Sequence, residues 1–376
     1  MKIAFNGHRL AGQRLGVGRY IEYLLRYWGG GMLGDDERVS LFMRRPLDQA
    51  GLDYLQLGSK IEPIVLGPDM PGIPWENIRL RWPAASHDVL FCPAYTAPVL
   101  YRKPLVVATH SVNEIAPGAH TWRHRQTYLR LYQHSARSAD AVIVPAEVTR
   151  RDVREHLGIA DERIFVVPQG SDDTFVPLDD EDAMVRVRER FFGSDRPYVL
   201  FVGKCSVRRN IPLLVRAFAR ARRERGIPHG LLLFGPNVAN FPLEDLFREL
   251  GVENDVVQTD GEVAVHRELV EIYNAADVFV HPSLYEGWSM TTVEALACGT
   301  AVIAANRGGL AEAVSGHGLM LDDLSEESLA SAIGDVLTDD ALRRDLETRA
   351  FERGRTLRWL QTTEETLDVL RRVAAR

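Results

Sequence analysis

Short apolar runs alternate along the chain with longer segments of helical periodicity. The runs are rich in Val, Ile, Leu and Phe with little polar alternation, which is typical of parallel strands covered by helices on both faces. They predict strands at residues 2–5, 39–42, 89–91, 105–109, 141–144, 164–167, 198–202, 230–234, 256–258, 278–281 and 301–304. Helices are predicted at about 17–28, 121–138, 147–157, 211–225, 243–250, 265–275 and 290–298. This alternation indicates an α/β protein with doubly wound sheets.

A turn-rich stretch divides the chain of 376 residues, a length suited to two domains with separate cores. Turn formers cluster at residues 168–173, an acidic run follows, and a new strand begins at Tyr198. We therefore predict a first domain of residues 1–178 and a second of residues 179–356. The amphipathic segment 357–376 predicts a terminal helix that returns to the first domain. The alternative is a helix that packs only on the second domain.

Composition narrows the possible classes. The net charge of -7 and the pI of about 5.9 argue against a general nucleic-acid binder. Cys92, Cys205 and Cys298 are far apart and contain no C-x-x-C pair, so we expect buried free thiols rather than a zinc site or disulfides. The N-terminus has no long apolar segment, and no run approaches the roughly 18 residues of a membrane span. We therefore expect a cytoplasmic protein.

The strongest chemical signal is the segment 286–299, which follows a predicted strand, turns at Gly287 and leads into a helix. The backbone amides of residues 289–292 are the unpaired donors of that helix N-terminus, a natural diphosphate site. Glu286 precedes the helix and Glu294 lies about one turn inside it. The two carboxylates can therefore flank a bound phosphate and accept hydrogen bonds from sugar hydroxyls. The alternative is two surface carboxylates, one in a turn and one on a helix.

A second strand–helix turn carries three cations. Gly203 ends a predicted strand, and Lys204, Arg208 and Arg209 follow before the next helix. Cations on such a loop can hold a diphosphate leaving group, on which charge builds as the glycosidic bond breaks. A solvated basic turn is the alternative.

Two further features lie in the first half of the chain. Gly16 and Gly18 precede an amphipathic helix and allow close backbone approach to a ligand, but the third glycine of a dinucleotide fingerprint is absent. His110 directly follows a strand, where residues of a doubly wound sheet face the ligand crevice. A satisfied structural histidine is the alternative.

With these residues the chain resembles the family-4 glycosyltransferases, which are retaining enzymes of GT-B fold. The resemblance covers nearly the whole length and is specific at residues 273–300, where a Glu-x7-Glu element lies between a strand and a helix. It implies two doubly wound, Rossmann-like parallel-sheet domains facing a cleft. It also implies a nucleotide-sugar donor on the second domain, an acceptor on the first, and no required metal or other cofactor.

The resemblance also implies roles for single residues. Glu286 would bind the donor sugar hydroxyls and Glu294 the ribose, while Lys204 and Arg209 would hold the diphosphate. His110 would contact the transferred sugar, and Glu286, Lys204, Arg209 and His110 are thus the catalytic candidates. The other donor-side candidates are Gly16, Gly203, Val263, Ser289, Met290, Thr291 and Thr292, and the acceptor-side candidates are Asn6, His8 and Tyr95.

Several positions depart from the family pattern. Lys204 stands where arginine is usual and Arg209 where lysine is usual, which keeps the charge but exchanges the fork geometry. Ser111 stands where aspartate commonly follows the family histidine. Pro145 and Ala146 stand where a serine is usual, and Gln169 stands where asparagine is usual. The last three departures fall in the half that reads acceptors, so the acceptor stays open.

The sequence predicts a retaining glycosyltransferase that uses a nucleoside-diphosphate sugar, with GDP-mannose favoured over UDP- or dTDP-sugars. The acceptor would be a saccharide, lipid-linked or small-molecule hydroxyl. The alternatives are a GT-B epimerase or phosphorylase, a non-catalytic carbohydrate-binding protein, and an NAD-dependent oxidoreductase, which the glycine pattern disfavours. Residues 122–137 mix basic and aromatic side chains, so weak peripheral contact with an anionic inner membrane face is an alternative to a solvated helix. The oligomeric state stays open.

Overall fold

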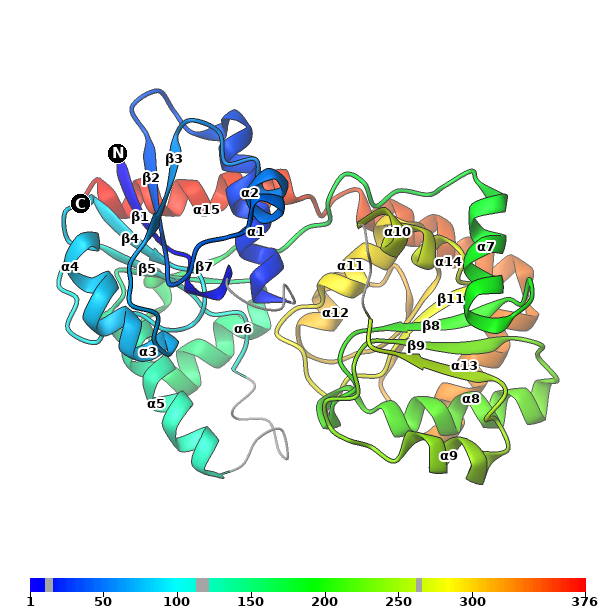
Figure 1. The fold of residues 1–376 in the computed structure, drawn as a ribbon. Helices are drawn as coiled ribbons and strands as arrows, with labels where there is room; N and C mark the ends of the chain where they lie inside the picture. Colours follow the sequence, from blue (N-terminus) through cyan, green and yellow to red (C-terminus); the bar gives the residue numbers. More distant parts are fainter. Residues whose placement is uncertain (11–15, 113–121, 262–265) are drawn as a thin grey trace. The chain divides into compact units, whose positions relative to one another are not determined.

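A computed structural model of the chain describes residues 1–10, 16–112, 122–261 and 266–376, without the side chains of residues 122–126 and 266. The described residues form two compact units, Met1–Gly170 with Trp359–Arg376 and Ser171–Arg358. Each unit is built on one parallel sheet that is covered by helices (Figure 1).

The first unit contains a sheet of seven strands in the order β3-β2-β1-β4-β5-β6-β7, with parallel neighbours throughout. The strand order reverses between β1 and β4, which is where doubly wound sheets open a crevice at their carboxyl edge. The strands are β1 (Lys2–Asn6), β2 (Arg38–Met43), β3 (Ile61–Val65), β4 (Val89–Cys92), β5 (Leu105–Ala108), β6 (Ala141–Val144) and β7 (Ile164–Val166).

The helices of the first unit include the C-terminal helix α15, which runs beside β4, β5 and β6 (Figure 1). Trp28 Nε1 donates to the Thr363 carbonyl at 3.2 Å, and Arg371 Nε donates to Glu37 Oε1 at 2.8 Å. These bonds tie α15 to the opening segments of the chain. The helices are α1 (Val17–Tyr27), α2 (Gln49–Leu55), α3 (Gly72–Trp75), α4 (Arg81–Ala84), α5 (Trp122–Ser138), α6 (Glu147–Asp152) and α15 (Trp359–Ala374).

The second unit contains six strands in the order β10-β9-β8-β11-β12-β13, again all parallel, with its reversal between β8 and β11. The strands are β8 (Tyr198–Val202), β9 (Gly230–Phe234), β10 (Val256–Thr259), β11 (Val278–His281), β12 (Val302–Ala305) and β13 (Leu319–Leu321). The helices are α7 (Glu181–Phe192), α8 (Ile211–Arg225), α9 (Leu243–Leu250), α10 (His266–Asn274), α11 (Met290–Ala297), α12 (Gly308–Val314), α13 (Glu326–Thr338) and α14 (Asp340–Gly354).

Both faces of the second sheet are buried, which explains the apolar runs without alternation. Along β8, Val199 and Phe201 pack in one core cluster, whereas Tyr198, Leu200 and Val202 pack in a separate one. Successive side chains of a strand point to opposite faces, so both clusters demand apolar residues from the same run.

All eleven predicted strands are present, and two more were not predicted. Both additional strands, β3 and β13, are edge strands, and apart from the buried Ile61 their residues are intermediate or exposed. Pro63 lies inside β3, where a central strand would lose a ladder hydrogen bond but an edge strand tolerates it. These two edge strands therefore lack the continuous apolar signal on which the prediction depended, whereas the edge strands β7 and β10 were predicted.

The joint between the units lies at Gly170–Ser171 rather than after residue 178. Phe175 is fully buried and packs edge-on against Tyr273 at 5.9 Å between ring centroids. The Leu178 amide donates to Asn274 Oδ1 at 2.8 Å. Burial and hydrogen bonding therefore hold residues 171–178 in the second unit. The return to the first unit likewise falls after Arg358 rather than after residue 356.

The three cysteines are buried and unpaired, as predicted. Within the described ranges, no helix is both long enough and apolar enough to span a membrane.

Candidate functional site

The carboxyl edge of the second sheet gathers most of the predicted donor-side residues. Residues 203–210 follow β8, and residues 282–289 follow β11, the two strands between which the strand order reverses. The Leu284 amide donates to the Arg208 carbonyl at 2.9 Å, so the two loops are joined directly. The fold thus brings together two segments that lie about eighty residues apart in sequence.

Helix α11 begins at this edge with a side-chain cap. Ser289 Oγ accepts from the Thr292 amide at 3.3 Å and contacts Thr292 Oγ1 at 2.8 Å. The cap therefore uses one of the predicted diphosphate donors, the Thr292 amide. The amides of Met290 and Thr291 belong to the same first turn and have no partner within the helix. They are the amides that remain for an anion.

Glu286 is buried at the mouth of this site and is surrounded by cationic and polar groups. Its Oε1 forms an ion pair with Arg208 Nη1 and lies 3.4 Å from Arg209 Nε. Ser283 Oγ donates to the same oxygen at 3.2 Å, and His281 Nε2 lies 3.5 Å away. The predicted sugar-binding carboxylate is therefore held by contacts with Arg208, Arg209, Ser283 and His281.

Electrostatics keep the Glu286 carboxylate ionised. Burial alone raises its pKa, but the charge of Arg208, the hydrogen bond with His281 and the charge of Arg209 together bring the pKa well below its usual value. A permanently ionised carboxylate accepts hydrogen bonds from hydroxyls and does not serve as a proton donor near pH 7.

Arg209 lies flat against the backbone of Gly203. A Cβ added at Gly203 would come 1.7 Å from Arg209 Nη1, and Gly203 has a φ of 134°, so only glycine fits. Nη1 of Arg209 is buried without a hydrogen-bond partner among the described residues, whereas Nε faces Glu286 Oε1 at the 3.4 Å of an ion pair. Burial also lowers the pKa of this guanidinium. Unsatisfied buried donors on a cation are costly, and a bound anion would satisfy them.

Lys204 lies on the same loop but in a different environment. Its side chain is exposed and makes no ion pair with the described residues. Of the three cations noted in this loop, Arg208 and Arg209 converge on Glu286, and Lys204 does not. The contact of Arg208 with Glu286 was not predicted, because the sequence gives no reason to choose between two adjacent arginines.

Glu294 lies inside α11 and is buried. Tyr273 donates its hydroxyl to Glu294 Oε2 at 3.0 Å.

Helix α12 supplies a feature that was not predicted at all. A Cβ added at Gly309 would come 2.0 Å from the Gly287 carbonyl, and the Gly309 amide donates to the Glu286 carbonyl at 2.8 Å. The Gly308-Gly309 pair was the available sequence signal for this close approach.

In the first unit, His110 follows β5 and has both ring nitrogens engaged. Nε2 lies 2.7 Å from the Pro93 carbonyl, which can only accept, and Gln169 Nε2 lies 2.8 Å from Nδ1. Burial lowers the pKa of His110 to about 4, against a weaker opposing effect of the Pro93 bond. The ring is therefore neutral at pH 7, and a ligand could bond a ring nitrogen only by displacing one of these partners.

The acceptor-side candidates Asn6 and His8 belong to a buried polar cluster beside the β1–β4 reversal. Asn6 Nδ2 donates to Glu76 Oε1 at 2.8 Å, and Thr96 Oγ1 donates to the same oxygen at 2.9 Å. His8 Nδ1 lies 3.0 Å from Asn6 Oδ1. Burial raises the pKa of Glu76 to about 7 and lowers that of His8 to about 3. Glu76 was not predicted, because in sequence it is one of several polar residues in a mixed segment that also contains Asn77 and Arg79.

The remaining predicted residues are less closely grouped. Tyr95 has a φ of 69° and stacks on Tyr132 at 4.8 Å between ring centroids. Gly16 precedes α1 with a φ of 54° and is exposed. Val263 lies outside the described residues. In the described part of the chain, no group of three His, Cys, Asp or Glu side chains is arranged to hold a metal ion.

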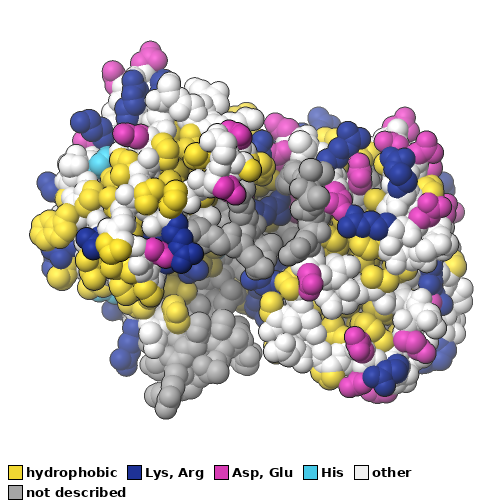
Figure 2. All heavy atoms as spheres, in the orientation of Figure 1, with side chains coloured by type: hydrophobic (Ala, Val, Ile, Leu, Met, Phe, Trp, Pro, Cys, Tyr) yellow, Lys and Arg dark blue, Asp and Glu magenta, His cyan; other side chains and the backbone are white. Residues whose placement is uncertain are grey.

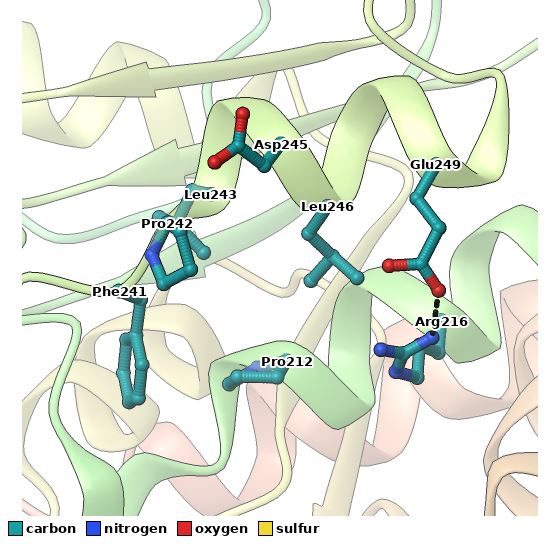
Figure 3. A pocket seen from close by; sticks show the side chains of 8 residues that line it. All are labelled: Pro212, Arg216, Phe241, Pro242, Leu243, Asp245, Leu246 and Glu249. Atoms are coloured by element: carbon teal, nitrogen blue, oxygen red, sulfur yellow. Dashed lines mark hydrogen bonds and ion pairs between the residues drawn. The ribbon is translucent and has the colours of Figure 1, made fainter.

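A cavity of about 190 Å³ lies between α8 and α9 (Figure 3). Arg216 points toward Glu249, and its Nη1 lies 3.2 Å from Glu249 Oε1, so this cation is already paired. Asp245 adds a second carboxylate to the lining. The cavity contains none of the predicted residues and does not suit a phosphate.

Comparison with known proteins agrees with this geometry. Residues 187–353 match the family described as "Glycosyl transferases group 1", and residues 15–175 match "Glycosyltransferase Family 4". D-inositol 3-phosphate glycosyltransferase of Nocardiopsis dassonvillei is 34% identical over 66% of this chain. The matched region spans 59% of that relative's length, and likewise 59% of the Kineococcus radiotolerans protein of the same name, which is 35% identical over 64% of this chain.

A solved structure with the same fold is sucrose-phosphate synthase of Thermosynechococcus elongatus. It has a TM-score of 0.79 and 22% identity, and the match covers 100% of this chain and 99% of that one. The two parallel-sheet units therefore have the arrangement of strands and helices found in GT-B glycosyltransferases.

Proposed function

The chain belongs to the family-4 glycosyltransferases of GT-B type, and we propose that it is a retaining enzyme that transfers a sugar from a nucleoside-diphosphate donor to an acceptor hydroxyl. One observation carries the proposal. An ionised, buried Glu286 lies beside an unsatisfied Arg209, at the strand-order reversal and next to the N-terminus of α11. A site that combines a sugar-hydroxyl acceptor with anion donors suits both halves of a nucleotide sugar.

In the proposed reaction the bond between the anomeric carbon and the diphosphate breaks, and its electron pair leaves with the diphosphate. Arg209, Lys204 and the first amides of α11 would stabilise the growing negative charge, which supports catalysis without a metal. The acceptor oxygen forms the new bond on the face that the diphosphate leaves, and its proton passes to a phosphate oxygen. Glu286 would hold the sugar hydroxyls, and Glu294 the ribose.

We propose the first unit as the acceptor side, with the cluster of Asn6, His8 and Glu76 available to hydroxyl-rich ligands. The name of the Nocardiopsis relative supports a phosphorylated polyol among the acceptors to test. GDP-mannose is the first donor to test, because of the chain's general likeness to bacterial mannosyltransferases. UDP- and dTDP-sugars belong in the same screen.

A thermal-shift screen against UDP, GDP, dTDP, ADP and NAD, with and without Mg²⁺, tests the donor side. A ligand at 100 times its Kd should add about 2.7 kcal/mol of stability. A metal-independent shift with one diphosphate supports the proposal, whereas a shift with NAD alone contradicts it. Acceptor-dependent release of that diphosphate then distinguishes a transferase from an epimerase, and the anomeric coupling of the product tests retention.

A further inference from the structure

Large apolar side chains are exposed together on one part of the first unit. Trp82 is 69% exposed, Ile78 and Leu100 are each 55% exposed, and Val99 is 36% exposed. The first two lie on the helical stretch formed by residues 76–84, and the other two lie on the loop between β4 and β5. We call these four side chains the Trp82 surface.

The helix and the loop form one continuous surface. The Val99 amide donates to Asn77 Oδ1 at 2.8 Å, and the Tyr101 hydroxyl donates to the Ala84 carbonyl at 3.1 Å. The loop therefore runs alongside the helix over its length, while the two helical members are four residues apart on one face. Figure 2 shows hydrophobic side chains gathered on the first unit over the region of α3 and α4.

The exposed members are not needed for the core. The opposite face of the same helical stretch supplies Leu80 and Ala84, which are fully buried in the core of the first unit together with Trp75 of α3. That face already satisfies the helix's packing against the sheet. A tryptophan on the outer face adds nothing to the core and does not increase solubility. We therefore interpret it as a contact site for an external partner.

The charges around the Trp82 surface are positive. Arg79, Arg81, Arg102 and Lys103 adjoin it in sequence, and none of them forms an ion pair with another described residue. The Arg81 guanidinium lies 4.7 Å from the centroid of the Trp82 ring. Unpaired cations at the edge of an apolar surface favour a partner that is apolar in its interior and anionic at its boundary.

Helix α5 extends this positive border. His134 Nε2 lies 2.9 Å from the Val99 carbonyl, which fixes the described part of α5 beside the loop. Arg130 is exposed and lies one turn before His134 on the same helix face. The sequence suggested residues 122–137 for membrane contact, and Arg130 belongs to that range, whereas the side chains of residues 122–126 lie outside the described part of the chain.

We propose that the Trp82 surface docks the first unit on an anionic lipid membrane. Tryptophan favours the membrane–water interface, and the three aliphatic side chains can enter the acyl boundary while the cations meet anionic headgroups. The Trp82 surface has four apolar side chains, whereas a stable protein interface uses about 20 to 30 residues a side. Peripheral membrane binding has no such requirement, because it depends on a modest apolar area and electrostatic attraction.

Co-sedimentation of the full chain with phosphatidylcholine vesicles, with and without phosphatidylglycerol, tests the proposal. We expect binding that requires the anionic lipid and weakens at high salt. Trp82→Ala with Leu100→Ser should weaken binding about tenfold or more. Arg102→Gln with Lys103→Gln should weaken it by about fivefold for each cation.

Two controls lie on the same unit. Leu360→Ser removes another exposed leucine, and Arg151→Gln removes another exposed arginine, and both should bind like the wild type. Wild-type protein that binds neither vesicle overturns the proposal, as does binding that the Trp82–Leu100 variant retains in full. A Trp82 surface whose removal abolishes self-association in sedimentation velocity, with no vesicle binding, would instead be a contact between copies and would overturn the proposal too.

Discussion

The strand-order reversals of the two sheets each have a buried carboxylate beside them, and their surroundings differ. In the second unit, Glu286 is surrounded by two arginines and a histidine. In the first unit, Glu76 is met by the amide of Asn6, the hydroxyl of Thr96 and the ring of His8, whose pKa burial lowers to about 3. The pKa of Glu286 therefore falls below its usual value, whereas burial raises that of Glu76 to about 7.

The comparison shows which part of the molecule sets the chemistry. Both sheets open at a reversal between their first and fourth strands, so topology determines where a ligand can bind. The loops that follow the strands determine the charge at that place. Cationic loops in the second unit suit a diphosphate, and neutral amides and hydroxyls in the first suit a hydroxyl-rich molecule.

The largest expected effect comes from removing the charge of Glu286, the buried carboxylate of the second unit. Glu286→Gln should lower turnover about a hundredfold or more, because the proposed sugar contact and the pairing of two arginines are lost together. Two partly buried cations without their partner should also cost about 3 kcal/mol of unfolding free energy. Turnover is measured by steady-state kinetics, and the unfolding free energy by denaturant titration.

Glu249→Gln, in the partly exposed pair with Arg216, is the control and should leave turnover and unfolding free energy nearly unchanged. A folded Glu286→Gln enzyme with full turnover would refute the assigned role.

The second largest effect concerns Glu76, the buried carboxylate of the first unit. Its contribution to the unfolding free energy depends on pH in a defined direction. The pKa of Glu76 is raised from 4.5 to about 7 in the folded protein. Its contribution to stability is therefore fully present below pH 4.5 and is lost as the pH rises to about 7. The loss should reach about 3 kcal/mol.

Denaturant unfolding of the wild type and Glu76→Gln between pH 4.5 and 7.5 measures this contribution. The difference in unfolding free energy between the two proteins should shift in favour of Glu76→Gln as the pH rises. A pH-independent difference would mean that Glu76 has an ordinary pKa, and the contrast with Glu286 would disappear.

The smallest expected effect is on diphosphate binding and comes from Gly203. A matched glycine variant separates the loss of space beside Arg209 from the backbone strain that any substitution at a positive φ causes. Gly203→Ala should displace Arg209 from its position against the backbone and weaken diphosphate binding about tenfold, the loss of one charge-assisted hydrogen bond. Gly226→Ala is the matched control, since Gly226 also has a positive φ, of 64°, but has open space around its Cα. It should lower stability by about 1 kcal/mol without changing binding. Equal nucleotide affinity in the two variants would remove Arg209 from the diphosphate site.

Most of the fold was predictable because both faces of the central strands are buried. The runs at β8, β9 and β11 contain little polar alternation and were placed correctly. Helix α14 was not predicted, because its buried positions are limited to Leu346, Ala350 and Gly354 in a segment that is otherwise highly charged. Such a helix depends on its place in the tertiary structure rather than on a strong amphipathic pattern.

The sequence by itself determined the parallel α/β architecture, the helix N-terminus at Ser289 and the family resemblance, since strand burial, helix capping and local spacing are all written within short segments. Only the tertiary structure decided which cations meet Glu286, why Gly309 must lack a side chain, and that Glu76 lies beside Asn6. These contacts join residues that are 22 to 78 positions apart, or choose between adjacent arginines by the direction of their side chains. Burial and distance set their charge states, and neither is encoded in local sequence.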